Sequence, residues 1–328
     1  TRNCGCSSGR KLKVMKLAII NDYQRLSQES ADWSRLPDDV EVDVYYDRLA
    51  SGAAALLAPY DIVVTSREET LFDRALIEQL PNLKLLVTHG GRNAALDLAA
   101  LRDQGVVVCG TGYGYANATV ELAWGLILSL AKLIPEEDLG VRAGDWGLHL
   151  PSGLTGKTLG VLGLGQLGSG VARVAQAFDM PVIAWSENLT EARCVELGVE
   201  RVGKDALFAQ SDVLSIHTIL SDRTRGLVGA REIALMKPTA MLINTSRGPI
   251  VDETALVDAL RRHIIAGAGL DVFDVEPLPY DHPLRGLSNT VLTPHIGGRT
   301  RENFAARYKD CLEDVLAWLD GVPVRVIE

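Results

Sequence analysis

A glycine-rich segment and a set of polar side chains in the second half of the chain suggest a chemical function. The segment is Gly163-Leu164-Gly165-Gln166-Leu167-Gly168, a G-x-G-x-x-G sequence that follows the strand-like run 158–163 and opens a helical pattern. In that setting the first glycine permits a tight turn, the second lets the backbone approach a pyrophosphate, and the third lets the helix pack closely on the strand. The helix N-terminus adds amide donors. A bound dinucleotide is therefore favoured over a purely structural glycine turn.

The end of the next predicted strand, residues 181–185, bears on which dinucleotide binds. The fingerprint requires an acidic residue there for the ribose 2′-hydroxyl, and this position falls on Ser186, with Glu187 beside it. Glu187 would repel a 2′-phosphate, and no arginine lies nearer in the sequence than Arg193. We therefore expect NAD, with NADP left open.

Three polar side chains each follow a predicted strand, and together they suit hydride transfer to a carbonyl group. They are Arg247, Glu276 and His295. A histidine can donate a proton to a developing alkoxide near neutral pH, and a neighbouring carboxylate orients the imidazole and raises its pKa. A guanidinium can bind a substrate carboxylate and polarise the adjacent carbonyl. Taken singly, each residue type is also common in ordinary loops and turns.

Short β-rich runs alternate with helical patterns from Met15 onward, which predicts two parallel, doubly wound α/β sheets. The first half contains the predicted strands 16–20, 40–46, 61–65, 84–88 and 106–110. The second contains the predicted strands 158–163, 181–185, 213–217, 240–245, 266–273 and 290–295. A long helix is expected over 116–131, followed by a loop, and a last helix over 302–319. Residues 1–14 are polar and are expected to be a disordered extension.

Composition excludes several classes of protein. The 328 residues are 47 % hydrophobic and 23 % charged, typical of a globular protein with two domains. A net charge of −9 argues against a nucleic-acid partner, and no apolar run is long enough for an ordinary transmembrane helix. The five cysteines match neither a disulfide framework nor a metal site, and no secretory signal is visible. We therefore expect a cytoplasmic protein without a metal or a membrane partner.

Four stretches of the second half resemble the D-isomer-specific 2-hydroxyacid dehydrogenase family in order and spacing. They are LTGKTLGVLGLGQLGSG (154–170), MKPTAMLINTSRGPI (236–250), GLDVFDVEP (269–277) and LTPHIGG (292–298). The first half is similar more weakly, through PNLKLLVTHGG (81–91). The resemblance implies an NAD(P)-dependent enzyme that interconverts a small 2-oxo acid, such as glyoxylate or hydroxypyruvate, and the D-2-hydroxy acid.

The resemblance also implies a role for each matching residue. It assigns substrate binding to Arg247, the pairing carboxylate to Glu276 and the general acid/base to His295. Further positions are implied to line the cofactor or to hold the substrate carboxylate through backbone amides. These are His217, Thr245, Ser246 and Asp271 for the cofactor, and Gly90, Gly91 and Arg92 for the substrate.

In this family the cofactor domain is inserted into the substrate domain. The resemblance therefore implies a flavodoxin-like substrate domain of residues 15–110 plus 299–328 and a Rossmann-type domain of residues 111–298. It also implies a homodimer formed through the helix–loop segment 116–151.

Alternatives remain open from the sequence. The same fold occurs in a nicotinamide-sensing co-repressor family, so a sensor is the second hypothesis. Formate oxidation is disfavoured because formate dehydrogenases have Gln at the position of Glu276. Arg92 replaces the family's usual glycine: it would either add a second anion contact to the substrate or point to solvent or pair with Asp97. Arg299, where a small residue is usual, either lines the pocket mouth or caps the last helix.

Overall fold

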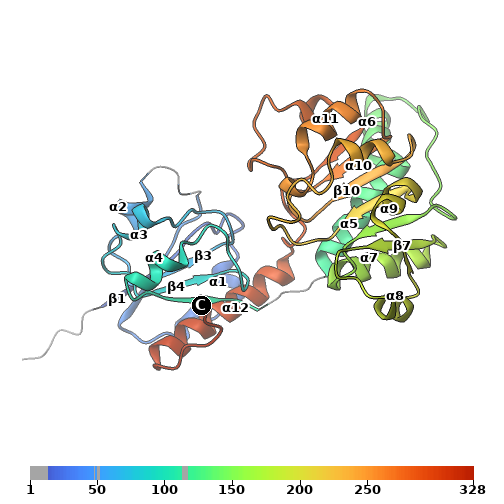
Figure 1. The fold of residues 1–328 in the computed structure, drawn as a ribbon. Coiled ribbons are helices and arrows are strands. Elements are labelled where there is room, and N and C mark those ends of the chain that lie inside the picture. The colour runs from blue at the N-terminus through green and yellow to red at the C-terminus, as the bar shows by residue number, and fades with distance from the viewer. Residues whose placement is uncertain (1–13, 48, 50–51, 113–116) are drawn as a thin grey trace, which may run out of the picture. The chain divides into compact units, whose positions relative to one another are not determined.

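The computed structural model describes residues 14–47, 49, 52–112 and 117–328. The chain forms two compact units, one of Thr1–Tyr115 with Arg301–Glu328 and the other of Ala116–Thr300 (Figure 1). We call them unit 1 and unit 2 and describe each by itself. The predicted N-terminal extension, apart from Val14, lies outside the described residues.

Unit 1 contains a five-stranded parallel sheet with the order β2-β1-β3-β4-β5. This is the order of flavodoxin-like sheets, as expected from the sequence. Its strands are β1 (Met15–Ile19), β2 (Val40–Val44), β3 (Ile62–Thr65), β4 (Leu85–Thr88) and β5 (Val107–Gly110).

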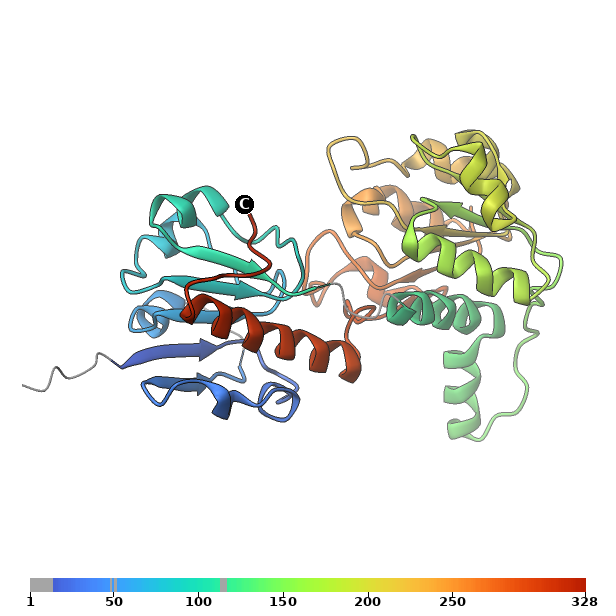
Figure 2. The ribbon, with the colours of Figure 1, turned by 90° about the horizontal axis from the view of Figure 1, so that it is seen from below.

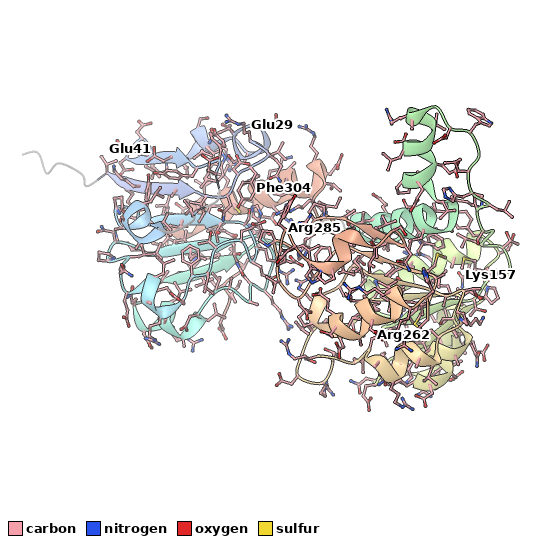
Figure 3. All side chains as sticks on the ribbon, turned by 90° about the horizontal axis from the view of Figure 1, so that it is seen from above. Glu29, Glu41, Lys157, Arg262, Arg285 and Phe304 are labelled. Carbon is pink, nitrogen blue, oxygen red and sulfur yellow. The ribbon has the colours of Figure 1, made fainter. Side chains whose placement is uncertain are left out.

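Helices cover both faces of this sheet. Successive residues of a strand point to opposite faces, and they belong to two different apolar clusters. Leu17 and Ile19 pack in the cluster that includes α12 (Arg301–Leu319), whereas Ala18 and Ile20 pack in the other. Figure 3 labels Phe304, one of the buried residues of α12. The remaining helices are α1 (Ser27–Ser30), η1 (Trp33–Arg35), α2 (Ala53–Leu57), α3 (Arg74–Ile77) and α4 (Leu98–Asp103).

The segment after α12 returns to the edge of the sheet, next to β5 (Figure 2). Val326 pairs with Cys109 in an antiparallel bridge, and the Gly110 amide donates to the Arg325 carbonyl at 3.0 Å. The Arg325 side chain donates back to α12, to Asp314 Oδ1 at 2.9 Å. This ion pair fastens the C-terminal segment to the helix that precedes it.

Unit 2 contains a seven-stranded parallel sheet with the order β12-β11-β10-β9-β6-β7-β8. The chain winds outward from β6 in both directions, so the order reverses between β6 and β9, as in Rossmann folds. Its strands are β6 (Leu159–Leu162), β7 (Val182–Trp185), β8 (Glu200–Arg201), β9 (Val213–Ile216), β10 (Met241–Asn244), β11 (Gly267–Leu270) and β12 (Thr290–Leu292). The predicted fold class is confirmed.

Helices also cover both faces of the unit 2 sheet. On one face α5 (Asn117–Lys132) and α7 (Gln166–Ala177) share an apolar cluster with Val161. On the other face α9 (Lys204–Gln210) and α11 (Glu253–Arg261) share one with Leu162. The shorter elements are α8 (Glu191–Leu197), α10 (Ala230–Leu235), η2 (Gly248–Ile250) and η3 (Pro283–Gly286).

The expectation of a loop after the long helix is wrong over Ile134–Ala143, which forms α6. Pro135 lies in the first turn of α6, where a backbone N–H has no hydrogen-bond acceptor within the helix, so the missing N–H of proline costs nothing. Gly140 has no side chain, which leaves room for Leu148 to pack against the helix. Leu133 adopts a left-handed conformation (φ +53°), and the chain bends there by 58° between α5 and α6 (Figure 2).

Within the described part of the chain, no single helix is long and apolar enough to cross a membrane. The bent pair α5 and α6 passes the same test only when the two are taken together, by length and composition. Seven residues of α5 are buried in unit 2.

The Asp314–Arg325 ion pair predicts a pH dependence of stability. Burial raises the pKa of Asp314 to about 7, although the charge of Arg325 and its hydrogen bond oppose the rise. Between about pH 4 and pH 7, therefore, Asp314 holds a proton in the folded state that it has lost in the unfolded state. The free energy of unfolding consequently falls as the pH rises through this range. Asp314→Asn removes this titration. We expect the free energy of unfolding of the variant, relative to wild type, to improve by about 2 kcal/mol between pH 5.5 and pH 8.

Urea unfolding at the two pH values measures this change. Glu313→Gln is the matched control, because Glu313 contacts the same arginine at 3.2 Å but is exposed. Its charge is only a minor cause of the raised Asp314 pKa, so its difference from wild type should vary with pH much less than that of Asp314→Asn. A constant difference for Asp314→Asn would contradict the prediction.

Candidate active site

The predicted His295 and Glu276 side chains meet in unit 2. His295 Nδ1 lies 2.6 Å from Glu276 Oε2, and about a third of each side chain is exposed. Burial opposes ionisation of Glu276, but the hydrogen bond and charge of His295, the Phe273 amide and the charge of Arg247 outweigh it and lower the pKa of Glu276. An ionised carboxylate only accepts, so Nδ1 donates and Nε2 is left to exchange a proton with a ligand.

Asp271 holds the turn that carries His295. Its buried carboxylate accepts from the Thr293 hydroxyl at 2.6 Å and from the amides of Ile296 and Gly297, each at 2.8 Å. Burial raises the pKa of this carboxyl, and those donors, together with the His295 charge, oppose the rise. His295 itself has a left-handed backbone (φ +55°). In the structure Asp271 therefore orients the His295 turn, and its contact with a cofactor stays a prediction.

Arg247 follows β10, and the backbone of its loop packs directly on the loop that carries Glu276. A Cβ on Gly248 would lie 2.0 Å from the carbonyl carbon of Phe273. The Asn244 side chain donates to the Arg247 carbonyl at 3.0 Å, and Arg247 Nη1 donates to the Ser246 carbonyl at 2.7 Å. Because β10, β11 and β12 are neighbours in the sheet, their carboxyl ends bring all three predicted catalytic residues to one edge.

The glycine segment has the geometry of a phosphate loop. Gly163 adopts φ +100°, and a Cβ there would lie 2.9 Å from the backbone of His217. A Cβ on Gly168 would meet the Gly163 carbonyl oxygen at 2.1 Å, so α7 can approach β6 only with glycine there. Gly165 differs, because nothing lies within 4 Å of its Cβ position. Gly165 is the N-cap residue of α7 and provides no side-chain hydrogen bond to the amides of the first turn. Gln166 and Leu167 are the first two residues of that helix.

Some buried polar atoms at the carboxyl ends of the neighbouring strands have no hydrogen-bond partner among the residues that the structure describes. They include Nδ1 of His217 and the hydroxyl of Thr245, at the ends of β9 and β10. His217 Nε2 bonds the Ser215 hydroxyl at 2.8 Å, and burial lowers the pKa of His217 to about 4, so its ring is neutral at pH 7. Ser246 donates to the Ile216 carbonyl at 3.0 Å. The open glycine and the unsatisfied buried atoms fit a dinucleotide.

The end of β7 carries Ser186, half buried, and Glu187, exposed. Arg193, the arginine nearest to this position in the sequence, is engaged elsewhere: one nitrogen pairs with Glu196 at 2.7 Å and another donates to Ser169 at 3.1 Å. These contacts favour a ribose hydroxyl over a phosphate at this position.

The predicted substrate turn lies in unit 1, directly after β4. Gly90 adopts φ +85°, and its amide donates to the Thr111 hydroxyl at 2.7 Å. Nothing lies within 4 Å of the Cβ position of Gly91. Arg92 is exposed and forms no ion pair with Asp97, which instead caps α4 through the Ala100 amide.

A residue beside this turn that the sequence does not single out is Arg67, whose Nη1 lies 3.9 Å from the Cβ position of Gly90. Arg67 follows β3 as Gly90 follows β4, and these strands are neighbours in the sheet. The adjacency of the strand ends was the signal that could have identified it.

Comparison with known proteins agrees with this geometry. A family model described as "D-isomer specific 2-hydroxyacid dehydrogenase, NAD binding domain" matches residues 124–297. A glyoxylate reductase of Aeropyrum pernix is 40 % identical over 88 % of this chain and 89 % of its own length. One of Thermococcus litoralis is 38 % identical over 86 % and 88 %. The solved structure of a phosphoglycerate oxidoreductase of Vibrio cholerae superposes with a TM-score of 0.87 at 32 % identity and covers 94 % of this chain and 99 % of that one. These similarities confirm the predicted enzyme class and NAD cofactor and favour an enzyme over a sensor.

Gly165 provides a test of dinucleotide binding that leaves the fold intact. Gly165→Ala places a methyl group in open space, so thermal stability should stay near that of wild type. If a pyrophosphate approaches this backbone, the methyl group obstructs it, and we expect the Kd for NADH to rise at least tenfold, about 1.4 kcal/mol. Fluorescence titration measures the Kd.

Gly203→Ala is the matched control. Gly203 also caps a unit 2 helix, has a similar φ (−70° against −78°) and has an equally open Cβ position. Its Kd should match wild type. Equal affinities for all three proteins would contradict the predicted loop.

Proposed function

Because this chain belongs to the D-isomer-specific 2-hydroxyacid dehydrogenase family and is an NAD-dependent 2-oxo acid reductase of it, we propose that its substrate is glyoxylate or hydroxypyruvate. The glyoxylate reductases of Aeropyrum pernix and Thermococcus litoralis, similar over most of their length, support this substrate class. The observation that carries the catalytic assignment is the His295–Glu276 pair, 2.6 Å between Nδ1 and Oε2, beside the Arg247 loop.

NAD, when bound, exchanges hydride with the 2-carbon of the substrate. The protein's own residues manage charge and protons. His295, in the reductive direction, donates the Nε2 proton to the substrate oxygen and becomes neutral. Glu276 holds the imidazole through Nδ1, which leaves Nε2 to exchange the proton with the substrate. Arg247 binds the substrate carboxylate and lowers the energy of the developing negative charge on the carbonyl oxygen.

We assign the cofactor to the unit 2 edge formed by the phosphate loop. Gly163, Gly165, Gln166, Leu167 and Gly168 would hold its pyrophosphate, and Ser186 its ribose. His217, Thr245 and Ser246 would line the cofactor, and this is supported by the unsatisfied His217 and Thr245 atoms. Asp271 would act mainly through the His295 turn.

The substrate domain in this proposal is residues 15–110 with 299–328, and the cofactor domain is residues 111–298. The division of the chain into Thr1–Tyr115 with Arg301–Glu328 and Ala116–Thr300 supports these boundaries. The Gly90–Gly91–Arg92 turn would contribute the backbone amides of Gly91 and Arg92 to the substrate carboxylate, since the Gly90 amide already donates to Thr111. We also propose a cytoplasmic location, which is supported by the free thiols of Cys109, Cys194 and Cys311.

The segment 116–151 is proposed to form a homodimer. Six large apolar side chains of α6 and the loop after it are more than half exposed within the single chain, which is unusual for a surface without a partner. They are Ile134, Leu139, Val141, Trp146, Leu148 and Leu150, from 51 % to 95 % exposed.

Substrate choice and proton donation are tested together by the absorbance of NADH. We expect the highest kcat/KM with glyoxylate or hydroxypyruvate in a panel that includes pyruvate, phenylpyruvate, oxaloacetate and 2-oxoglutarate.

With the best substrate, His295→Ala should lower kcat about 10²- to 10⁴-fold, because water replaces a positioned acid. The Kd for NADH of this variant is the control and should stay within twofold. Wild-type turnover by His295→Ala would refute the assignment.

The dimer is tested by charge at its proposed surface. Trp146→Asp with Leu150→Asp should convert the dimer to a monomer, because burying two carboxylates costs more than the interface gains. Light scattering after gel filtration gives the mass. Val195→Asp, at a residue 72 % exposed on α8, is the control and should stay dimeric; a double variant that also stays dimeric would overturn the proposed interface.

A further inference from the structure

Unit 2 contains a second histidine–carboxylate pair close in the chain to the first. His282 Nε2 lies 3.0 Å from Glu253 Oε1, and both side chains are more than four-fifths buried. Glu253 is the first residue of α11, six positions after Arg247, and His282 is six positions after Glu276. The proposed reaction uses neither residue.

The Glu253 carboxylate reaches the loop that carries Glu276. Its second oxygen, Oε2, accepts the Asp274 amide at 3.2 Å, while Glu276 Oε1 accepts the preceding amide, that of Phe273, at 3.0 Å. Two carboxylates therefore bind successive amides of one loop. One belongs to the proposed catalytic pair, and the other anchors the loop to the start of α11.

His282 anchors the far end of the same loop. Its Nδ1 accepts the Leu284 amide at 3.3 Å, so the neutral ring carries its proton on Nε2 and donates to Glu253. Three residues later, Arg285 (Figure 3) donates to the carbonyl oxygens of Leu278 and Pro279 at 2.7 and 2.8 Å. The segment that follows Glu276 is thus folded back onto η3, and Glu253 ties that turn to α11.

Polar contacts are needed here because apolar packing secures only part of this loop. Val275, next to Glu276, is 61 % exposed, and Tyr280 is 96 % exposed. Leu278 packs against the core. The Gly248 backbone touches Phe273 and Asp274, so the Arg247 loop and the Glu276 loop are in contact at the point where Glu253 binds.

We propose that Glu253 and His282 are positioning residues that hold Glu276, and through it His295, in place relative to Arg247. This inference rests on the catalytic roles proposed above. Neither residue reaches the reacting atoms in this scheme. Their effect on the reaction passes through the backbone of residues 273–276 and the carboxylate of Glu276.

The test compares Glu253→Ala and His282→Ala with wild type, with NADH and the best 2-oxo acid. We expect kcat to fall about tenfold or more, because a small displacement of an acid–base pair is costly, and the KM for NADH to stay within twofold. The solvent deuterium isotope effect on kcat should increase, since proton donation becomes more rate-limiting. A loss of folded protein alone lowers kcat without changing an isotope effect.

Two further variants separate positioning from general stability. In His282→Gln the side-chain amide can still donate to Glu253, so most of the lost kcat should return and the isotope effect should fall toward wild type. Glu232→Gln is the matched control: Glu232 is also buried near a helix start, accepts the Gly229 amide at 3.1 Å and pairs with a cation, Lys204, at 3.0 Å. It should lower the melting temperature and leave the isotope effect unchanged.

The outcomes distinguish this inference from the proposed function. If His295→Ala is inactive while Glu253→Ala and His282→Ala keep wild-type kcat or an unchanged isotope effect, the positioning role is overturned and the catalytic assignment stands. If His295→Ala keeps wild-type turnover, the catalytic assignment fails first. If Glu253→Ala does not fold, His282→Ala and its glutamine counterpart decide the question.

Discussion

The hydrogen bonds accepted by one buried carboxylate, that of Asp271, are the constraint on which the catalytic edge of unit 2 depends. Asp271 follows β11 and binds the turn after β12, so it joins the ends of two neighbouring strands. These bonds fix the turn on both sides of His295, whose backbone is left-handed. Its imidazole then meets Glu276, which comes from the β11 side of the same junction.

A common design recurs along this edge. Carboxylates bind backbone amides and thereby set the positions of loops that the sheet itself leaves free. Asp271 does so for the His295 turn, and Glu276 and Glu253 do so for residues 273 and 274. This use of carboxylates holds the loops of the catalytic edge rigidly in place. Arg247 lies on the adjoining loop, where its charge lowers the pKa of Glu276.

How far the sequence could predict this arrangement depends on how local each signal is. The strands, the phosphate loop and the His295–Glu276 pair are predictable, because periodicity and parallel-strand topology bring the strand ends together. Helix α6 is missed because proline and glycine are common in loops. Here the first turn of the helix tolerates Pro135, and Leu148 packs on Gly140. Glu253–His282 is missed because it joins loops whose spacing depends on close backbone contacts, such as that of Gly248, which no sequence pattern encodes. Arg67 beside Gly90 is different, because the neighbouring ends of β3 and β4 could have identified it. The predicted roles of Arg92 and Arg299 stay open.

Unit 1 is assembled from both ends of the described chain, with the whole of unit 2 between them. Helix α12 covers one face of its sheet, and the segment around Arg325 and Val326 pairs with the edge strand β5. A ribosome synthesises these pieces after unit 2. The first part of unit 1 therefore cannot complete its fold when it is synthesised, and it leaves an apolar face and an unpaired strand edge uncovered. Unit 2, whose sequence is continuous, can fold before unit 1 is complete. Nascent chains of this protein should therefore be exposed to chaperones and to aggregation throughout the synthesis of unit 2, until residues 301–328 follow.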